Sequence, residues 1–368
     1  MQFILRPWRS YGYNIISSTK TSSCPKRLKH IILPSRRLNS TQSTINDGKV
    51  SNNHAVYVRS SLSAGLVPYE KGWAWQHMLL NRRLNYMRTQ QKLDTTTLGE
   101  GDQFGVVDQH KQDKDWILLF EHHPVYTLGR GATEDNLTFL DSEADGGIEK
   151  RKRLSRKYRG EDASRLNIDR FQNHNTSFTN NNNVSEQEEV DELSSQSIKC
   201  MSQPVLAPNG SPIYRIERGG EVTFHGPGQL VMYPLLNLKN PIYQQDLHWY
   251  LRNIEEVIIQ TLLHFDIKSN RDDINTGVFV GQNKIAAVGV SASKWITTHG
   301  LALNVSPNLD NFDKDISIPC GLKDRGVTSI SDILGESSCP SLKEVAEVSL
   351  SCFGKVFDVD VREGSSIR

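Results

Sequence analysis

Residues 218–229 read Arg218-Gly219-Gly220-Glu221-Val222-Thr223-Phe224-His225-Gly226-Pro227-Gly228-Gln229. The apolar stretches on either side, 213–218 and 230–238, have the length and composition of buried strands. Glycine lets the backbone approach a ligand closely and exposes N–H groups that can bind an oxygen. A wide hairpin turn is the alternative, but a turn needs neither the arginine, which can pair with an anion, nor the histidine, which can move a proton. The segment therefore predicts a ligand-binding loop between two strands.

Outward from this segment, the apolar patterns alternate between helices and strands. Helical spacing occurs in 69–88, 245–265 and 342–353. Strand patterns occur in 116–121, 125–128, 213–218, 230–238, 277–280, 284–290, 295–305 and 356–361. Several strands are close enough to form hairpins, such as the pair joined by Gly281-Gln282-Asn283. We therefore expect an α/β (α+β) fold with a mixed, largely antiparallel sheet flanked by helices, and not a doubly wound sheet.

The first 46 residues have the composition of a targeting segment. They contain eight basic residues and no acidic residue, and serine and threonine are frequent. Their short apolar runs are too short for a secretory signal, so we expect a mitochondrial transit peptide in 1–46. A disordered basic tail is the alternative. Without this segment the chain has 35 basic residues against 42 acidic ones, so the formal net charge of +1 conceals an acidic protein.

A second polar block runs from 141 to 212. A basic cluster at 150–159 is followed by an asparagine run at 180–183 and an acidic cluster at 186–192. The block has no apolar periodicity and cannot bury enough surface to offset its ordering entropy, so we expect a disordered insertion. A nucleic-acid or localisation patch is the alternative for the basic cluster. The remaining residues, 47–140 and 213–368, would form a single domain of about 250 residues.

Composition excludes several classes of protein. No run of about 18 apolar residues is present, so a membrane span is not expected. Five cysteines in 368 residues do not make a disulfide scaffold, and no Cys-x-x-Cys or His-x-x-x-His pair suggests a metal site. The near-neutral total charge does not favour a nucleic-acid binder.

Three further residues could carry chemistry. Lys284 opens a strand of small apolar residues; it is either a solvated strand end or a lysine with a depressed pKa that moves protons. Cys320 lies in a Pro-Cys-Gly turn, where it is more accessible than most free cysteines, which are buried, so it is either a nucleophile or a structural thiol. His299 precedes small residues on a strand, and such a histidine is more often a hydrogen-bonded core or rim residue than a catalyst.

Together these segments resemble the lipoyl(octanoyl) transferase family, the octanoyl-acyl-carrier-protein:protein N-octanoyltransferases, in its mitochondrial, fungal-type form. The resemblance covers most of 112–335 and rests on the order and spacing of five motifs. These are Glu121-His122-x-Pro-Val-Tyr-Thr, the segment 218–229, Gly277-Val-Phe-Val-Gly-x-x-Lys284-Ile, His299-Gly-Leu-Ala-Leu-Asn-Val305 and Ile318-Pro-Cys-Gly321. The insertion 141–212 departs from the bacterial pattern but interrupts no motif.

The resemblance implies a role for each matching position. Cys320 would carry the acyl group as a thioester, and Lys284 would lower the pKa of that thiol and move protons. The implied substrate-binding residues are Arg218, Gly219, Gly220, Glu221, Val222, Thr223, Phe224, His225, Ala287, Val288, Gly289, Gly300, Leu301, Ala302 and His122. Glycine N–H groups would bind the oxyanion, and valine and leucine side chains would line an acyl tunnel. No metal and no cofactor is implied.

The implied reaction transfers an octanoyl group from octanoyl-acyl carrier protein to a lysine of lipoyl domains. The acceptors would be the E2 subunits of 2-oxoacid dehydrogenases and the glycine cleavage H protein, in the mitochondrial matrix. The implied fold is similar to the catalytic fold of biotin/lipoate protein ligases. One alternative is an ATP-dependent ligase, which would need a basic nucleotide-binding loop where His225-Gly-Pro-Gly stands. The other is a non-catalytic protein that docks lipoyl domains.

Overall fold

The structure is a computed structural model that describes residues 54–96, 114–133, 205–272, 275–312 and 325–364, with 91–96 as backbone only. It also describes residues 137, 140, 150, 185, 187–188, 190–192, 195 and 367. All of them belong to the unit Asn52–Arg368. The predicted transit peptide, 1–46, and Cys320 lie outside the described residues.

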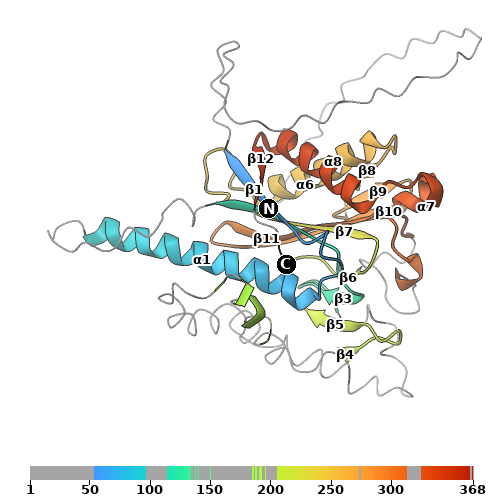
Figure 1. Cartoon of the computed structure of the whole chain (residues 1–368), viewed down its shortest axis with the longest axis horizontal. Helices are drawn as coiled ribbons and strands as arrows, with labels where there is room; N and C mark the ends of the chain where they lie inside the picture. Colours follow the sequence, from blue (N-terminus) through green and yellow to red (C-terminus); the bar gives the residue numbers. More distant parts are fainter. Residues whose placement is uncertain are drawn as a thin grey trace, which may run out of the picture. The chain divides into compact units, whose positions relative to one another are not determined.

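The larger of two sheets has eight strands (Figure 1). Their order is β12 (Asp360–Glu363), β1 (Ala55–Ser60), β2 (Asp115–Phe120), β7 (Gln229–Leu235), β11 (Ile296–Asn304), β10 (Asn283–Ser293), β9 (Val278–Val280) and β8 (Asn270–Arg271). β1 is parallel to both β12 and β2, and every other neighbouring pair is antiparallel. The predicted mixed, largely antiparallel sheet is confirmed.

The smaller sheet consists of β4 (Val205–Leu206), β5 (Pro212–Arg215), β3 (Val125–Leu128) and β6 (Val222–His225), in that order. The prediction of a single loop over 218–229 is wrong for 222–225. These four residues pair with β3 in the register Val125↔His225. Their sequence, Val-Thr-Phe-His, alternates in the way that suits a strand with two buried faces. Only the residues on either side of β6 remain as turns.

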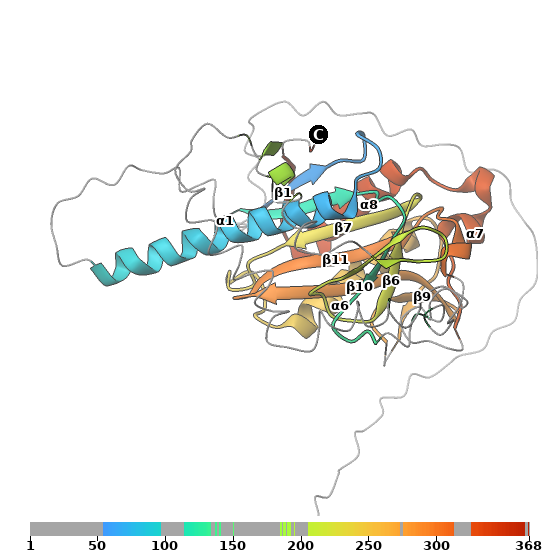
Figure 2. The ribbon, with the colours of Figure 1, turned by 90° about the horizontal axis from the view of Figure 1, so that it is seen from below.

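Helices cover both faces of the larger sheet. α1 (Tyr69–Thr96) runs along one face, and α6 (Leu247–His264) and α8 (Leu342–Phe357) lie on the other (Figure 2). Successive residues of β2 point to opposite faces, so Ile117 packs beneath α6 and α8 while Leu118 packs beneath α1. A short helix, α7 (Ile330–Leu334), precedes α8. None of the described helices combines the length and apolar character needed to cross a membrane.

Two predicted boundaries at the C-terminal end shift. α8 continues to Phe357, beyond the predicted end at residue 353, because Phe353 and Phe357 stack in the core with ring centroids 4.4 Å apart. Asp358, with φ of 53°, ends the helix in the left-handed conformation. The last strand is therefore Asp360–Glu363 and not 356–361.

The predicted insertion 141–212 lies mostly outside the described residues, which include 205–212 and several residues around Val190. The smaller sheet resumes at Val205, so the predicted boundary at 213 is wrong by eight residues. Val190 is fully buried in the core beneath α1, and Asp191 lies 2.9 Å from Lys71 of that helix. Val190 shares this core cluster with Trp73 and Trp75 of α1, so its burial stabilises this part of the insertion.

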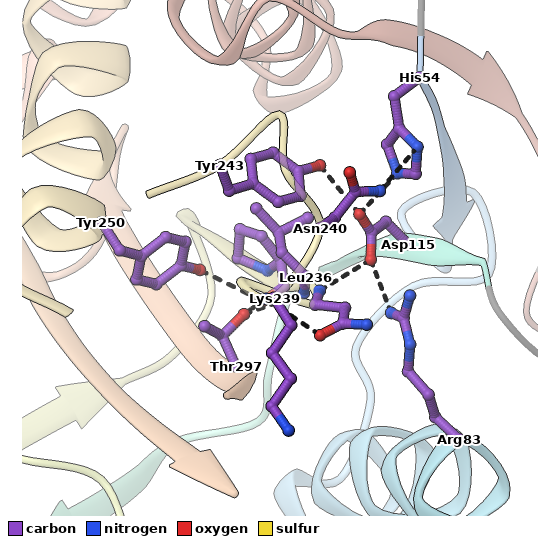
Figure 3. Close-up of polar contacts among 11 residues, drawn as sticks. His54, Arg83, Asp115, Leu236, Lys239, Asn240, Tyr243, Tyr250 and Thr297 are labelled. Carbon is purple, nitrogen blue, oxygen red and sulfur yellow. Dashed lines mark hydrogen bonds and ion pairs between the residues drawn. The ribbon is translucent and has the colours of Figure 1, made fainter. Parts of the chain in front are cut away.

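Asp115 links four parts of the fold through one buried carboxylate (Figure 3). It accepts hydrogen bonds from Arg83 of α1 at 2.6 Å, His54 at 2.7 Å, the Asn237 N–H at 2.9 Å and the Tyr243 hydroxyl at 2.9 Å. Burial by itself would raise the pKa of Asp115, but these partners outweigh burial and hold the pKa below its usual range. The ionised carboxylate therefore holds α1 and the β7–α6 connection against β2.

Replacing Asp115 with asparagine should destabilise the protein by about 3 kcal/mol, because it removes the anion paired with buried Arg83. Urea unfolding at pH 7 measures this. Since the folded-state pKa is lowered, the carboxylate stabilises the fold above its unfolded pKa of about 3.9, and this stabilisation is lost as pH falls further. Asp115→Asn should therefore lose less stability than wild type on acidification. Asp360→Asn, which breaks an exposed pair with Arg362, is the control, and an equal effect would contradict the prediction.

Candidate active site

A pocket of about 180 Å³ lies where β6 and the turn before it face β10 and β11. We call it the central pocket. The predicted site residues that line it are Arg218, Gly220, Glu221, Thr223, His225, Lys284, Ala287, Val288, Gly289, Gly300, Leu301 and Ala302. Four further residues that were not predicted also line it: Tyr233, Asn275, Thr276 and His299. The structure therefore brings three separate sequence motifs to one cavity.

Some predicted substrate-binding side chains point elsewhere. Val222 and Phe224 belong to the core of the smaller sheet, whereas Thr223 and His225 line the pocket. The physical reason is the two-residue alternation of β6, which the loop interpretation missed. Val288 and Leu301 likewise belong to the core beneath α6 and α8, so they meet the pocket through their backbone and do not line an acyl tunnel with their side chains.

Small residues allow the two sheets to approach each other at the pocket. The Gly219 N–H donates to the Val290 carbonyl of β10 at 2.9 Å. A Cβ atom on Gly289 would lie 3.0 Å from the Gly219 carbonyl oxygen and 3.1 Å from Arg218 Cδ. On β11, Gly300 pairs with Gly289 across the two strands. Glycine at position 289 is needed because a larger side chain would push the 218–220 turn away from β10. A Cβ on Gly300 would instead clash with the Met232 carbonyl oxygen of β7.

The predicted oxyanion role does not fit two of the glycine amides. Gly219 N–H bonds to Val290, and Gly228 N–H donates to the Glu121 carboxylate at 2.7 Å. Both amides are therefore engaged within the protein. These bonds hold the two ends of the 218–229 segment and leave its middle, β6, facing the pocket.

Arg218 uses much of its guanidinium to hold backbone. It donates to the Thr127 carbonyl at 2.9 Å, to the Thr127 hydroxyl at 2.8 Å and to the Gly219 carbonyl at 2.9 Å. These contacts attach the 218–220 turn to β3. The side chain also lines the pocket, so its charge contributes to the electrostatic field there.

Lys284 is buried at one end of the pocket. Its Nζ donates to the Thr276 carbonyl at 3.2 Å and lies 5.2 Å from the centre of the Phe279 ring. Gly277, with φ of 131°, leaves room for it, since a Cβ there would lie 3.3 Å from Lys284 Cε. The solvated strand-end interpretation is thereby excluded, because only 6% of the residue is exposed.

The chain re-enters the described structure beside Lys284 after the segment that contains Cys320. Lys284 N–H donates to the Gly326 carbonyl at 2.9 Å, and Thr328 N–H donates to the Lys284 carbonyl at 3.0 Å. Arg325 bonds to Asp272 at 2.5 Å. Six residue steps separate Cys320 from Gly326, so chain geometry keeps their Cα atoms within about 22 Å.

Two histidines at the site are held neutral. Burial lowers the pKa of His225 to about 3, and the nearby His122 adds to this effect. Burial likewise lowers the pKa of His122 to about 4. His122 does not line the pocket; it lies behind it, with Nδ1 2.9 Å from the Val67 carbonyl and Nε2 3.3 Å from the Tyr233 hydroxyl. Neither imidazole carries a positive charge near pH 7, so any cationic role at the site falls to other groups.

Sequence reasoning missed Glu217, the residue immediately before the 218–229 segment. Its Oε1 lies 2.8 Å from His77 Nε2 and 2.9 Å from His299 Nε2, and its Oε2 lies 3.3 Å from Trp73 Nε1. Burial by itself would raise the pKa of Glu217, but the imidazoles of His299 and His77 outweigh it and hold the pKa well below its usual range. No sequence signal could have found this cluster, because its members come from α1, the β5–β6 turn and β11.

The described residues contain no group of three or more histidine, cysteine or acidic side chains arranged to hold a metal ion. Cys320 lies outside these residues, so its predicted position beside Lys284 stays a prediction.

Comparison with known proteins gives the family. Residues 194–354 match the model of the lipoyl protein ligase A/B catalytic domain. The octanoyltransferase of Gloeobacter violaceus is 33% identical over 306 residues, which cover 83% of this chain and 92% of that protein. The chain belongs to the octanoyltransferase family. The chloroplastic octanoyltransferase LIP2p2 of Arabidopsis thaliana is also 33% identical, over 73% of this chain and 65% of its own longer chain. A bi-partite lipoate protein ligase from Thermoplasma acidophilum is 14% identical with a TM-score of 0.45, over 86% of this chain and 87% of that one.

The alternation along β6 can be tested in this octanoyltransferase-family chain. Val222→Ala should lower the free energy of unfolding by about 2 kcal/mol and leave the KM for acyl substrate unchanged, because Val222 packs away from the pocket. Thr223→Val should raise that KM about fivefold with a smaller loss of stability, since a pocket-lining hydroxyl is removed. Steady-state kinetics and urea unfolding measure the two effects. The reverse pattern would show that the loop interpretation was right.

Proposed function

We propose that the protein transfers an octanoyl group from octanoyl-acyl carrier protein to a lysine of lipoyl domains, through a thioester on Cys320. The observation that carries the proposal is the convergence of Lys284 with the 218–225, 287–289 and 300–302 stretches on one pocket, in a chain of the octanoyltransferase family. The acceptors would be the lipoyl domains of 2-oxoacid dehydrogenase E2 subunits and the glycine cleavage H protein.

In the first step, the Cys320 thiolate attacks the thioester carbonyl of the donor. The bond from the carbonyl to the carrier's sulfur breaks, and the released thiolate takes up a proton. One thioester replaces another, so the acyl group keeps its reactivity. A free thiol with a pKa of about 8.5 is mostly protonated near neutrality, and a nearby ammonium favours the thiolate. Lowering that pKa by about two units needs about 2.7 kcal/mol of differential stabilisation, which Lys284 could supply.

In the second step, the acceptor lysine amine attacks the Cys320 thioester. The bond from carbonyl to sulfur breaks, an amide bond forms, and the attacking nitrogen loses one proton. Lys284, once it has given up its own proton, can accept this one. The burial of Lys284 against Phe279 and Thr276 supports this role, because it holds the amine at the pocket and away from bulk water.

Mass spectrometry and kinetics test this function. Wild type mixed with octanoyl carrier protein should gain one octanoyl group on Cys320, and Cys320→Ser should give no thioester. Lys284→Ala should slow transfer by about 100-fold or more between pH 6 and 9, because it loses both the ammonium and the proton acceptor. Lys343→Ala, at an exposed position on α8, is the control.

Two results would contradict the proposal. The first is transfer by Lys284→Ala at the wild-type rate. The second is a requirement for ATP and free octanoate in place of the carrier thioester, which would indicate a ligase instead.

The location of the enzyme is part of the same proposal. The acid-free, basic composition of 1–46 supports import into the mitochondrial matrix and removal of this segment. Isolated mitochondria should import the full chain and shorten it by about 40 residues, and a chain that lacks 1–46 should stay outside. Exchanging the basic residues of 1–46 for glutamine is a milder variant that should also abolish import. Import that persists in both variants would rule out the targeting role.

A further inference from the structure

His299 has a backbone conformation that a side-chain-bearing residue seldom adopts. Its φ is 60°, in the left-handed region, although it lies within β11 in the register Val290↔His299. Such a conformation is strained and persists only where the surroundings hold it. The backbone N–H donates to Gln76 Oε1 of α1 at 2.6 Å, which supplies one such restraint. A histidine held in this way points to a requirement for its side chain at this position.

Glu217 fixes which ring nitrogen of His299 carries the hydrogen. An ionised carboxylate only accepts hydrogen bonds, and the Oε1 atom of Glu217 faces the Nε2 atoms of both His77 and His299. Both Nε2 atoms must therefore carry a hydrogen. In a neutral imidazole the other nitrogen is then an acceptor, so His299 in its neutral form presents a lone pair at Nδ1.

Nδ1 of His299 is the ring nitrogen that could contact a ligand. Within the part of the chain that the structure describes, the ring of His299 bonds only to Glu217, through Nε2. His299 lines the central pocket next to Gly300. Some polar side-chain atoms of the described residues are fully buried without a hydrogen-bond partner, and Nδ1 of His299 is not one of them. The pocket therefore offers a hydrogen-bond acceptor of fixed orientation.

We propose that His299 is a substrate-binding residue that, in its neutral form, accepts a hydrogen bond at Nδ1 from an N–H group of the substrate, and that Glu217 is its positioning residue. The inference rests on the proposed function, which supplies two N–H sources. One is the amide-bearing arm that presents the donor thioester, and the other is the amine of the acceptor lysine. Both offer the same chemistry, and the two half-reactions distinguish them.

The first test is spectroscopic and independent of activity. In protein labelled with ¹⁵N-histidine, the ring nitrogen shifts of His299 should show the form protonated at Nε2, and the assignment follows from loss of the signal in His299→Asn. Glu217→Gln should shift the population toward the form protonated at Nδ1, because an amide can donate as well as accept. Glu217→Asp should restore the wild-type form. A His299 ring that is protonated at Nδ1 in wild type would overturn the proposal.

The second test is kinetic. His299→Asn removes the imidazole while keeping a residue that tolerates the left-handed backbone. It should raise KM by about tenfold in one half-reaction, because one hydrogen bond to the substrate is lost. A raised KM in the formation of octanoyl-Cys320 assigns the N–H to the donor arm. A raised KM in the transfer to the lipoyl domain assigns it to the acceptor lysine. His248→Asn, at an exposed position on α6, is the matched control.

The outcomes separate this proposal from the proposed function. Unchanged KM values in both half-reactions would overturn the proposal, and a lowered unfolding temperature of His299→Asn beside them would show that His299 is only structural. Failure of wild type to form octanoyl-Cys320 would instead contradict the proposed function, and the nitrogen shifts would still report on the Glu217–His299 pair.

Discussion

Glu217 places one buried carboxylate between helix α1, the β5–β6 turn and strand β11. Burial penalises its charge, and three N–H groups from Trp73, His77 and His299 compensate for that penalty. The compensation exists only when all three elements are in their native positions. The turn that begins the 218–229 segment is thereby fixed on the larger sheet, and the central pocket is formed between the two sheets as a consequence.

The approach of the two sheets also depends on glycine residues, which have no side chain, in the facing strands. Gly289 carries no side chain where the 218–220 turn crosses β10, and Arg218 of that turn bonds to Thr127. Gly300, its partner on β11, carries none where β11 lies against β7. Glycine in a strand and a left-handed residue at His299 both reduce stability. Their presence at the pocket is consistent with stability being given up where a ligand must come close to the backbone.

The charge states at the pocket follow from the same packing. His122 and His225 are so enclosed that burial lowers their pKa values to about 4 and about 3, and both stay neutral near pH 7. The positive groups that line the pocket are Lys284 and Arg218, and Arg218 is engaged with the backbone around it. Lys284 is thus the pocket cation to which we assign the proposed action on the Cys320 thiol, and the proposed acceptor role of His299 depends on its contact with Glu217.

Local patterns in the sequence were enough to predict much of this protein. The apolar spacing of 69–88 and 245–265 predicted α1 and α6, and the residues of 125–128 matched β3. These predictions hold because helix and strand periodicity depends on neighbours within a few residues. The family resemblance also predicted most of the residues that line the pocket, because residues of its motifs meet there.

Tertiary structure alone decided the rest. β6 is a strand because β3, nearly 100 residues earlier in the chain, pairs with it, and Val190 is ordered because it is buried beneath α1. Glu217 bonds to His77 across 140 positions and to His299 across 82. Burial and hydrogen bonding between such distant residues depend on how whole elements pack, and no periodicity in the sequence records that arrangement.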